Sequence, residues 1–261
     1  MKESFRRPPR QQEPKEEIEG QLEGRNALTE ALRSGRTIDK VMIAAGDTDR
    51  ALQRLAAEAK EAGAVVVPVD RRKLDAMSVT HSHQGVIALA AAREYFSIDD
   101  LLQEAADRGE APLLVICDEL TDPHNLGAIL RSAECAGAHG VIIPKRRSVG
   151  LTAVVAKASA GAIEYMKVAR VTNINSAIEE LKEKGVWIFG TAAEGSIPMY
   201  QADLRIPAAI VIGNEGDGMS RLVQKNCDVT VSIPMKGHIS SLNASAAASI
   251  LLYEAVRQRL G

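Results

Sequence analysis

The sequence predicts an α/β protein made of a C-terminal, mostly parallel sheet covered by helices and a smaller N-terminal α/β domain. Two observations carry this prediction: short, continuous apolar runs alternate with helical patterns along the chain, and an acidic stretch at 94–110 interrupts the alternation. A chain of 261 residues also suits two modest domains better than one. We therefore expect a disordered tail (1–20), a first domain (21–93), a linker (94–110) and a second domain (111–261).

Composition limits the possible classes of protein. Hydrophobic residues make up 46% and charged residues 25% of the chain, as in ordinary soluble proteins. No apolar run approaches the roughly 20 residues that cross a bilayer, and the N-terminus lacks the apolar core of a secretory signal. Three scattered cysteines fit a reducing compartment and argue against a metal site, so we expect a cytoplasmic protein without metal. Because the net charge is only −2, any nucleic-acid site must be a local patch.

The N-terminal half begins with a tail of charged residues, glutamines and three prolines that lacks apolar periodicity. From Gly24 the pattern predicts a helix around 27–32 with Gly35 as its C-cap. The elements expected next are a strand at 38–44, a helix at 49–61, a strand at 65–69, a short helix at 71–76 and an apolar strand within 80–92. Together they predict a compact α/β domain.

The acidic stretch Glu94–Glu110 carries six carboxylates and a single arginine. Ser97, followed by Asp99 and Asp100, favours the start of a short helix, because acidic side chains stabilise a helix N-terminus. We do not expect this acidic connector to contact RNA.

The C-terminal half predicts a strict alternation of strands and helices. The strands expected are 113–117, 140–143, 165–169, 186–190, 208–212 and 229–233, and the helices are 126–137, 151–160, 174–184, 220–226 and 243–259. Such an alternation predicts a mostly parallel sheet with both faces covered, in which ligands bind beyond the carboxyl ends of the strands. Three polar motifs lie at such ends.

The first motif is DELTDPHNLGAILRSAECAG (118–137). Asp122 and Pro123 are suited to the N-cap and first turn of a helix. Leu126, Leu130 and Ala133 form its buried face, which places Arg131 on the flank, about 100° from Leu130. An ordinary capped helix explains Asp122 and Pro123 but neither Asn125 nor Arg131.

The second motif, AIVIGNEGDGMS (209–220), places a glycine-rich loop between a strand and a helix. It lacks the lysine and hydroxyl residue of a P-loop and is not GxGxxG. Its carboxylates, Glu215 and Asp217, would repel a pyrophosphate. S-adenosylmethionine has no phosphate and carries a cationic sulfonium, so this loop suits it better than NAD, which argues against a dehydrogenase.

The third motif, IPMKGHISSLNASAAASILL (233–252), passes from a strand end through a loop into a helix of small residues. Ser240, Ser241 and Asn243 cluster where the helix begins, and side chains of these types cap free N–H groups. A capped helix after a loop is the simple alternative for this stretch.

Together the three motifs resemble those of the SpoU (TrmH-type) RNA ribose 2′-O-methyltransferases, a branch of the knotted SPOUT enzymes. The matches are DPxNxGxxxR, GNEG and IPMxGxxxSLNxSxA. The order EGRNALTEAL…HQGVIALA also resembles the ribosomal-protein-like substrate-binding domain that precedes the catalytic domain in many members. The resemblance implies a trefoil knot, a homodimer formed through the catalytic domain and S-adenosylmethionine as the cofactor.

The resemblance also implies roles for individual residues. It places Arg131, Asn125, Glu215, Ser241 and Asn243 at the target ribose. It assigns the cofactor to Gly213, Ile233 and Leu242, together with Thr191, Ile212 and Met235. The family proposal makes the arginine a base, whereas a guanidinium stays protonated in proteins and is better suited to holding a phosphate or a developing alkoxide. Both roles for Arg131 stay open at this point.

The function expected is methylation of a ribose 2′-hydroxyl, with a guanosine of 23S ribosomal RNA as the target. Transfer RNA is the alternative substrate, and a non-catalytic RNA-binding ribosome-assembly factor is the alternative outside the enzyme class. Intact Arg131, Asn125 and Asn243 argue against the latter. Lys145, Arg146 and Arg147 form the best candidate patch for the RNA backbone, although a solvated loop explains them equally well.

Overall fold

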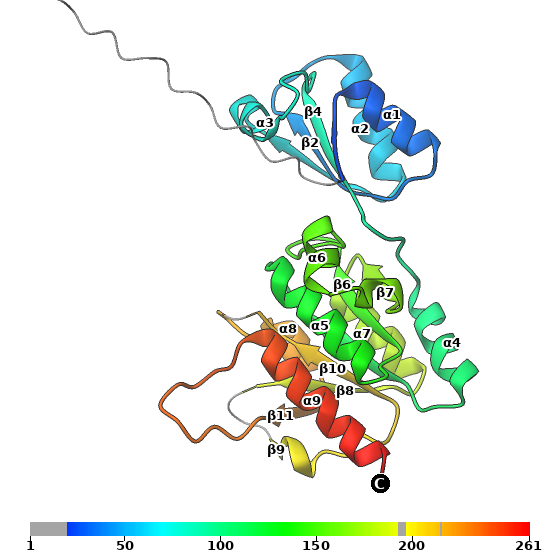
Figure 1. The fold of residues 1–261 in the computed structure, drawn as a ribbon, viewed down its shortest axis with the longest axis vertical. Helices are drawn as coiled ribbons and strands as arrows, with labels where there is room; N and C mark the ends of the chain where they lie inside the picture. Colours follow the sequence, from blue (N-terminus) through cyan, green and yellow to red (C-terminus); the bar gives the residue numbers. More distant parts are fainter. Residues whose placement is uncertain (1–19, 193–196, 215) are drawn as a thin grey trace, which may run out of the picture.

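The computed structural model describes residues 20–192, 197–214 and 216–261, which form two α/β domains (Figure 1). The N-terminal domain has a four-stranded sheet in the order β1-β4-β2-β3. Its elements are β1 (Gln21–Glu23), α1 (Arg25–Arg33), β2 (Ile38–Ala44), α2 (Arg50–Glu61), β3 (Val65–Val69), α3 (Arg71–Met77) and β4 (Val86–Ala90). The expected strands 38–44 and 65–69 are confirmed. The three-residue β1 is too short to show a periodicity in the sequence.

Local chemistry explains how this domain is held together. Asp49 caps α2 by accepting hydrogen bonds from the backbone N–H groups of the first turn, and Leu28 and Leu52 are fully buried beneath the sheet. Glu23 anchors the loop after α3: its carboxylate accepts hydrogen bonds from Ser78 Oγ (2.6 Å) and Val79 N (2.7 Å), and also from Thr80. Burial raises the pKa of Glu23, but these hydrogen bonds outweigh burial and bring it from 4.5 to about 2.

The C-terminal domain has a seven-stranded sheet in the order β7-β6-β5-β10-β8-β11-β9, and every neighbouring pair is parallel. The strands are β5 (Leu113–Cys117), β6 (Gly140–Pro144), β7 (Val168–Val171), β8 (Trp187–Thr191), β9 (Ile197–Pro198), β10 (Ala208–Ile212) and β11 (Val229–Ser232). The helices are α4 (Ile98–Arg108), α5 (Pro123–Cys135), α6 (Ala153–Ala158), α7 (Ile174–Glu183), α8 (Arg221–Asn226) and α9 (Ala244–Arg259). The predicted parallel sheet is confirmed, while the trefoil knot stays a prediction.

Several predicted elements of this domain were wrong at their ends, and two of these differences have a local cause. The strand expected at 165–169 begins only at Val168, because a 3₁₀ turn (η1, Ala162–Glu164) precedes it and leaves Tyr165 exposed. The helix expected at 151–160 is shortened at both ends to α6, and it begins at Ala153 because Thr152 Oγ1 accepts the backbone N–H of Val155 as its N-cap.

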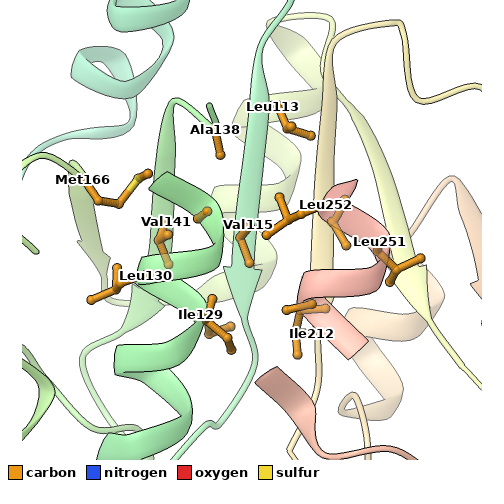
Figure 2. Close-up of a cluster of buried hydrophobic side chains, with 14 of the residues drawn as sticks. Leu113, Val115, Ile129, Leu130, Ala138, Val141, Met166, Ile212, Leu251 and Leu252 are labelled. Atoms are coloured by element: carbon orange, nitrogen blue, oxygen red, sulfur yellow. The ribbon is translucent and has the colours of Figure 1, made fainter. Parts of the chain in front are cut away.

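The two faces of the C-terminal sheet bury alternate residues of each strand. Leu113 and Val115 of β5 point to the face covered by α5, α6 and α9, whereas Leu114 and Ile116 point to the face covered by α4, α7 and α8. On the first face, side chains from α5 and α9 lie side by side over the sheet (Figure 2). This packing fixes the positions at which both helices begin.

Most of the acidic stretch is helix α4, which packs on the C-terminal sheet. Ser97 and Asp100 form a capping box at its start. Ile98 and Leu101 are buried, and a Cβ on Gly140 of β6 would lie 2.2 Å from Leu101 Cγ, so the helix sits directly on the strand. Only about residues 91–97 therefore cross between the domains. None of the described helices is long and apolar enough to span a membrane.

Candidate functional site

A cavity of about 740 Å³ opens at the carboxyl edge of the C-terminal sheet. The strands β10, β8 and β11 are neighbours there, so the loops that follow them meet at one place. The cavity is lined by Thr191, Ala192, Ile212–Asn214, Gly216–Met219, Gln224, Val231–Met235, Ser240–Leu242, Ala244, Ala247 and Leu251. Its volume lies within the range of small-molecule sites, about 300–1,000 Å³.

All six residues assigned to the cofactor from the sequence line this one cavity. They are Thr191, Ile212, Gly213, Ile233, Met235 and Leu242. Ser241, assigned to the ribose, lines it as well. Segments that begin near residues 191, 212 and 231 thus form a single pocket, while the role of each residue stays a prediction.

The glycine loop is held in shape by Asn214. Its Oδ1 accepts hydrogen bonds from the backbone N–H groups of Gly216 (2.9 Å) and Asp217 (2.8 Å), and its backbone exchanges two 3.1 Å bonds with Gly218. Gly213 has no room for a side chain, because a Cβ there would lie 2.2 Å from the carbonyl carbon of Gly218. The predicted site residue Glu215 lies outside the described residues.

Asp118 anchors the other end of this loop, a role that the sequence reasoning missed. It follows β5 directly, is buried, and its backbone N–H donates to the carbonyl of Ile212 (2.8 Å). Its Oδ2 accepts the backbone N–H of Ser220 (2.7 Å), which closes the loop against β5. A carboxylate placed immediately after a continuous buried strand was the available signal.

The structure brings the first and third motifs together through Asn125 and Asn243. The Nδ2 of Asn243 donates to Asn125 Oδ1 at 2.8 Å, although 118 residues separate them. The Oδ1 of Asn243 also caps α9, accepting the backbone N–H of Ser245 at 2.9 Å. Further along the two helices, the hydroxyls of Ser132 in α5 and Ser249 in α9 share a 2.7 Å hydrogen bond. The pair of asparagines therefore ties the start of α5 to the start of α9, beside the cavity.

Arg131 lies apart from this arrangement. It is exposed on α5, as the sequence predicted, and it is not among the described residues that line the cavity. Asn125 and Asn243 do not line it either. The cavity and the Asn125–Asn243 pair are thus adjacent and meet at Ser241–Asn243, whereas Arg131 belongs to neither.

No cysteine thiol near the site is activated. Burial, with the nearby charge of Asp118, raises the pKa of Cys117 to about 12. Burial also raises the pKa of Cys227 to about 11, with Asp228 adding to it. Both thiols stay protonated near neutral pH, which removes them as nucleophiles. Among the described residues, no cluster of His, Cys, Asp or Glu is suited to hold a metal ion.

The basic residues 145–147 follow β6 and so lie at the same edge of the sheet as the cavity. Arg146 and Arg147 are exposed, and Lys145 is half-buried. Arg147 forms a 3.1 Å ion pair with Glu119, which leaves much of its side chain in solvent. The patch is therefore placed beside the site, and its contact with RNA stays a prediction.

Comparison with known proteins agrees with this geometry. Residues 112–253 match the model of the SpoU rRNA Methylase family. The chain belongs to the SpoU methyltransferase family. Residues 21–96 match a second family, described as RNA 2′-O ribose methyltransferase substrate binding, so the chain joins an RNA-recognition domain to a methyltransferase domain.

Relatives of this SpoU protein match it over nearly its whole length. It is 49% identical over 236 residues to the putative TrmH family tRNA/rRNA methyltransferase YacO of Bacillus subtilis, covering 90% of this chain and 94% of YacO. A putative TrmH family tRNA/rRNA methyltransferase of Staphylococcus haemolyticus is 48% identical over the same shares.

Two solved structures resemble it over both domains. The SpoU methyltransferase AviRb from Streptomyces viridochromogenes, in complex with AdoMet, has a TM-score of 0.59 and 26% identity, covering 92% of this chain and 90% of AviRb. An AdoMet-bound rRNA methyltransferase from Sinorhizobium meliloti has a TM-score of 0.58 and 25% identity, covering 92% and 88%.

Proposed function

We propose that this SpoU protein transfers a methyl group from S-adenosylmethionine to a ribose 2′-hydroxyl of RNA, with a guanosine of large-subunit ribosomal RNA as the target. The observation that carries the proposal is the single cavity formed by the second and third motifs, directly beside the Asn125–Asn243 contact. A cofactor pocket and a set of polar groups for the nucleotide therefore meet at one edge of the sheet.

The residues of the cavity fit S-adenosylmethionine, which supplies an electrophilic methyl group on a sulfonium. Ile212, Ile233 and Leu242 offer apolar surface to an adenine, and the Asn214-built loop brings backbone close to a ligand because Gly213 carries no side chain. The carboxylate of Asp217, exposed on that loop, favours a cationic ligand over a phosphate. Asp118, at the end of β5, fixes the C-terminal end of this loop by accepting the backbone N–H of Ser220.

Methyl transfer requires the ribose hydroxyl to be aligned with the methyl group and relieved of its proton. The Asn125–Asn243 pair is suited to alignment, since the cap on α9 and the bond between the two amides fix both side chains. Arg131 is best suited to stabilise the alkoxide or the adjacent phosphate, because a guanidinium stays protonated at neutral pH.

A homodimer formed through the C-terminal domain is part of the proposal. Large apolar side chains are exposed on α9 and on the loop before it: Met235, Ile239, Leu242 and Tyr253. An exposed cluster of this kind is typical of an interface between proteins. Sedimentation equilibrium should give a mass twice that of one chain. The Ile239→Asp substitution should lower the measured mass toward that of a single chain.

The target is tested with labelled S-adenosylmethionine and total RNA from a strain that lacks the protein. After separation of the RNAs and mapping of the label, we expect a 2′-O-methylguanosine in large-subunit ribosomal RNA. Label in transfer RNA alone would support the proposed methyltransferase activity but show that the substrate is transfer RNA and not ribosomal RNA. Absence of label in all RNA, with cofactor binding intact, would favour a non-catalytic RNA-binding factor.

A further inference from the structure

The two domains are joined by a buried ion pair. Asp39 lies in β2 of the N-terminal domain and Arg170 in β7 of the C-terminal domain, and both side chains are less than a tenth exposed. Arg170 Nη1 donates to Asp39 Oδ1 at 2.7 Å, and its Nη2 donates to the backbone carbonyl of Asp39 at 3.0 Å. Both Nη atoms of the planar guanidinium therefore bind the same residue of the other domain.

A bulge in the N-terminal sheet aims Asp39 at its partner. In the pairing of β2 with β4, Ile38 faces Ala90 and Lys40 faces Leu89, which leaves Asp39 as the extra residue between them. A β-bulge of this kind redirects a side chain from the regular alternation of the strand. The carboxylate thus points out of its own domain.

The crossing segment contributes a third member, Tyr95. Its hydroxyl donates to Asp39 Oδ1 (2.7 Å) and accepts the backbone N–H of Leu151 in the C-terminal domain (2.9 Å). The guanidinium carbon of Arg170 also lies 5.1 Å from the centre of the Tyr95 ring, within cation–π range. One hydroxyl therefore bridges the two domains.

The surroundings allow little freedom at this contact. A Cβ on Gly150 would lie 2.3 Å from Asp39 Oδ2 and 2.9 Å from the Tyr95 hydroxyl, so the C-terminal domain closes tightly over the pair. Asp39 Oδ2 is buried without a hydrogen-bond partner among the described residues, which makes the carboxylate depend on Arg170 and Tyr95. Removing one partner of such a pair leaves an uncompensated buried charge.

We propose that Asp39, Tyr95 and Arg170 form an interdomain latch that sets the orientation of the RNA-binding domain relative to the methyl-transfer site. Domains joined by a short segment otherwise move relative to each other by default. In this orientation Gly63, in the turn between α2 and β3, comes within about 4 Å of Lys145 Nζ, measured from a Cβ built on the glycine. The latch thus holds the N-terminal domain against the basic residues that follow β6, on the edge that carries the cavity.

The consequence concerns substrate positioning and rests on the proposed function. RNA held by the N-terminal domain reaches the site in one geometry, so the latch residues are positioning residues and do not touch the reacting atoms. Loosening the latch should weaken productive RNA binding far more than cofactor binding, since a misplaced substrate loses rate steeply.

Three variants test the latch in the full-length protein. Asp39→Asn keeps the shape of the side chain and removes its charge, Arg170→Gln removes the opposite charge, and Tyr95→Phe removes only the bridging hydroxyl. Arg205→Gln, which breaks an exposed ion pair with Asp203 within the C-terminal domain, is the matched control. Small-angle X-ray scattering reports the domain arrangement, and turnover of total RNA together with S-adenosylhomocysteine affinity reports function.

For each latch variant we expect a larger radius of gyration and maximum dimension, a fall of at least tenfold in kcat/KM for RNA and cofactor affinity within about twofold of the parent, consistent with sites that do not share contacts. The double variant Asp39→Asn/Arg170→Gln should be no worse than the worse single variant, because neither charge is then left unpaired. Tyr95→Phe, which keeps the packing, preserves the test should a charge variant fail to fold.

Parent-like scattering and parent-like kcat/KM in all three variants would overturn the latch, as would strictly additive losses in the double variant. Failure of the proposed function is distinguishable from failure of the latch. A parent protein that methylates no RNA would refute the proposed function. The scattering comparison between the parent and the latch variants would still decide whether the latch exists.

Discussion

Replacing Gly213 by alanine should disable the cofactor pocket without unfolding the protein. The new Cβ would lie 2.2 Å from the carbonyl carbon of Gly218, 2.3 Å from the backbone nitrogen of Met219 and 2.5 Å from the Gly218 oxygen. All three are backbone atoms, which cannot rotate away as a flexible side chain can. The loop must therefore move by about 1 Å or more from the position in which it lines the cavity.

The magnitude follows from the cost of overpacking. Forcing an extra methyl group into a packed site costs about 1–3 kcal/mol. If the loop relieves this strain by leaving its closed position, binding must restore that position and lose the same free energy. Affinity should then fall by about 5- to 150-fold.

Gly216→Ala is the matched control in the same loop. Its Cβ would lie 3.6 Å from Asn214 Oδ1, an ordinary contact, and alanine keeps the N–H that donates to that oxygen. Calorimetric titration with S-adenosylhomocysteine measures the affinity, and thermal unfolding followed by circular dichroism checks the fold. Parent-like affinity in the Gly213→Ala protein, equal to that of the Gly216→Ala protein, would refute the assignment of this cavity to the cofactor.

Three further predictions concern Arg131, acid stability and the acidic helix. Arg131→Ala should leave cofactor affinity unchanged but slow methylation by two or more orders of magnitude, on the order of 3 kcal/mol, and a parent-like rate would move the catalytic site elsewhere. In Arg131→Lys, partial recovery without a new pH dependence indicates electrostatic stabilisation, whereas activity that rises through a new ionisation indicates a base. Because the pKa of Glu23 is lowered to about 2, this carboxylate stabilises the fold above pH 4.5 and the contribution is lost as the pH falls toward 2. Glu23→Gln should therefore lower the free energy of unfolding at pH 7 by on the order of 1–2 kcal/mol. In denaturant titrations, the free energy of unfolding of this variant should also fall less steeply between pH 4.5 and 2 than that of the parent. An unchanged pH profile would contradict this. Finally, a protein starting at Phe96 should fold, dimerise and bind cofactor yet methylate RNA poorly. A protein starting at Pro112 lacks α4, whose apolar side chains pack on the sheet, and should therefore unfold at a lower temperature. Equal melting temperatures of the two truncated proteins would disprove this role of α4.

The sequence was sufficient for most of the longer elements, though not for the short strands β1 and β9, and for the edge of the sheet that carries the site. Short continuous apolar runs such as 113–117 and 208–212 indicate buried strands in a sheet covered on both faces, and the polar motifs follow directly after them. The N-caps of α5 and α9 could also be recognised, because Asp122 and Asn243 are residue types with a strong preference for that position.

Long-range arrangement could not be predicted from these patterns. Nothing in the apolar run of β10 says that it lies between β5 and β8, since a parallel strand buried on both faces carries no local signal of its neighbours. The bond between Asn125 and Asn243 joins side chains 118 residues apart and depends on how α5 and α9 pack over the sheet. The bulge at Asp39 adds one residue to an otherwise regular strand and leaves no trace in its composition.

The chemical position of the transferred methyl group decides whether this SpoU protein acts on the ribose. RNA treated with the protein and isotopically labelled S-adenosylmethionine is digested to nucleosides, which are identified by mass spectrometry, with Arg131→Ala as the inactive control. We expect label on the ribose of a 2′-O-methylnucleoside in the parent reaction and at least a hundredfold less in the Arg131→Ala reaction. Label on a base, or equal label from both proteins, would contradict it.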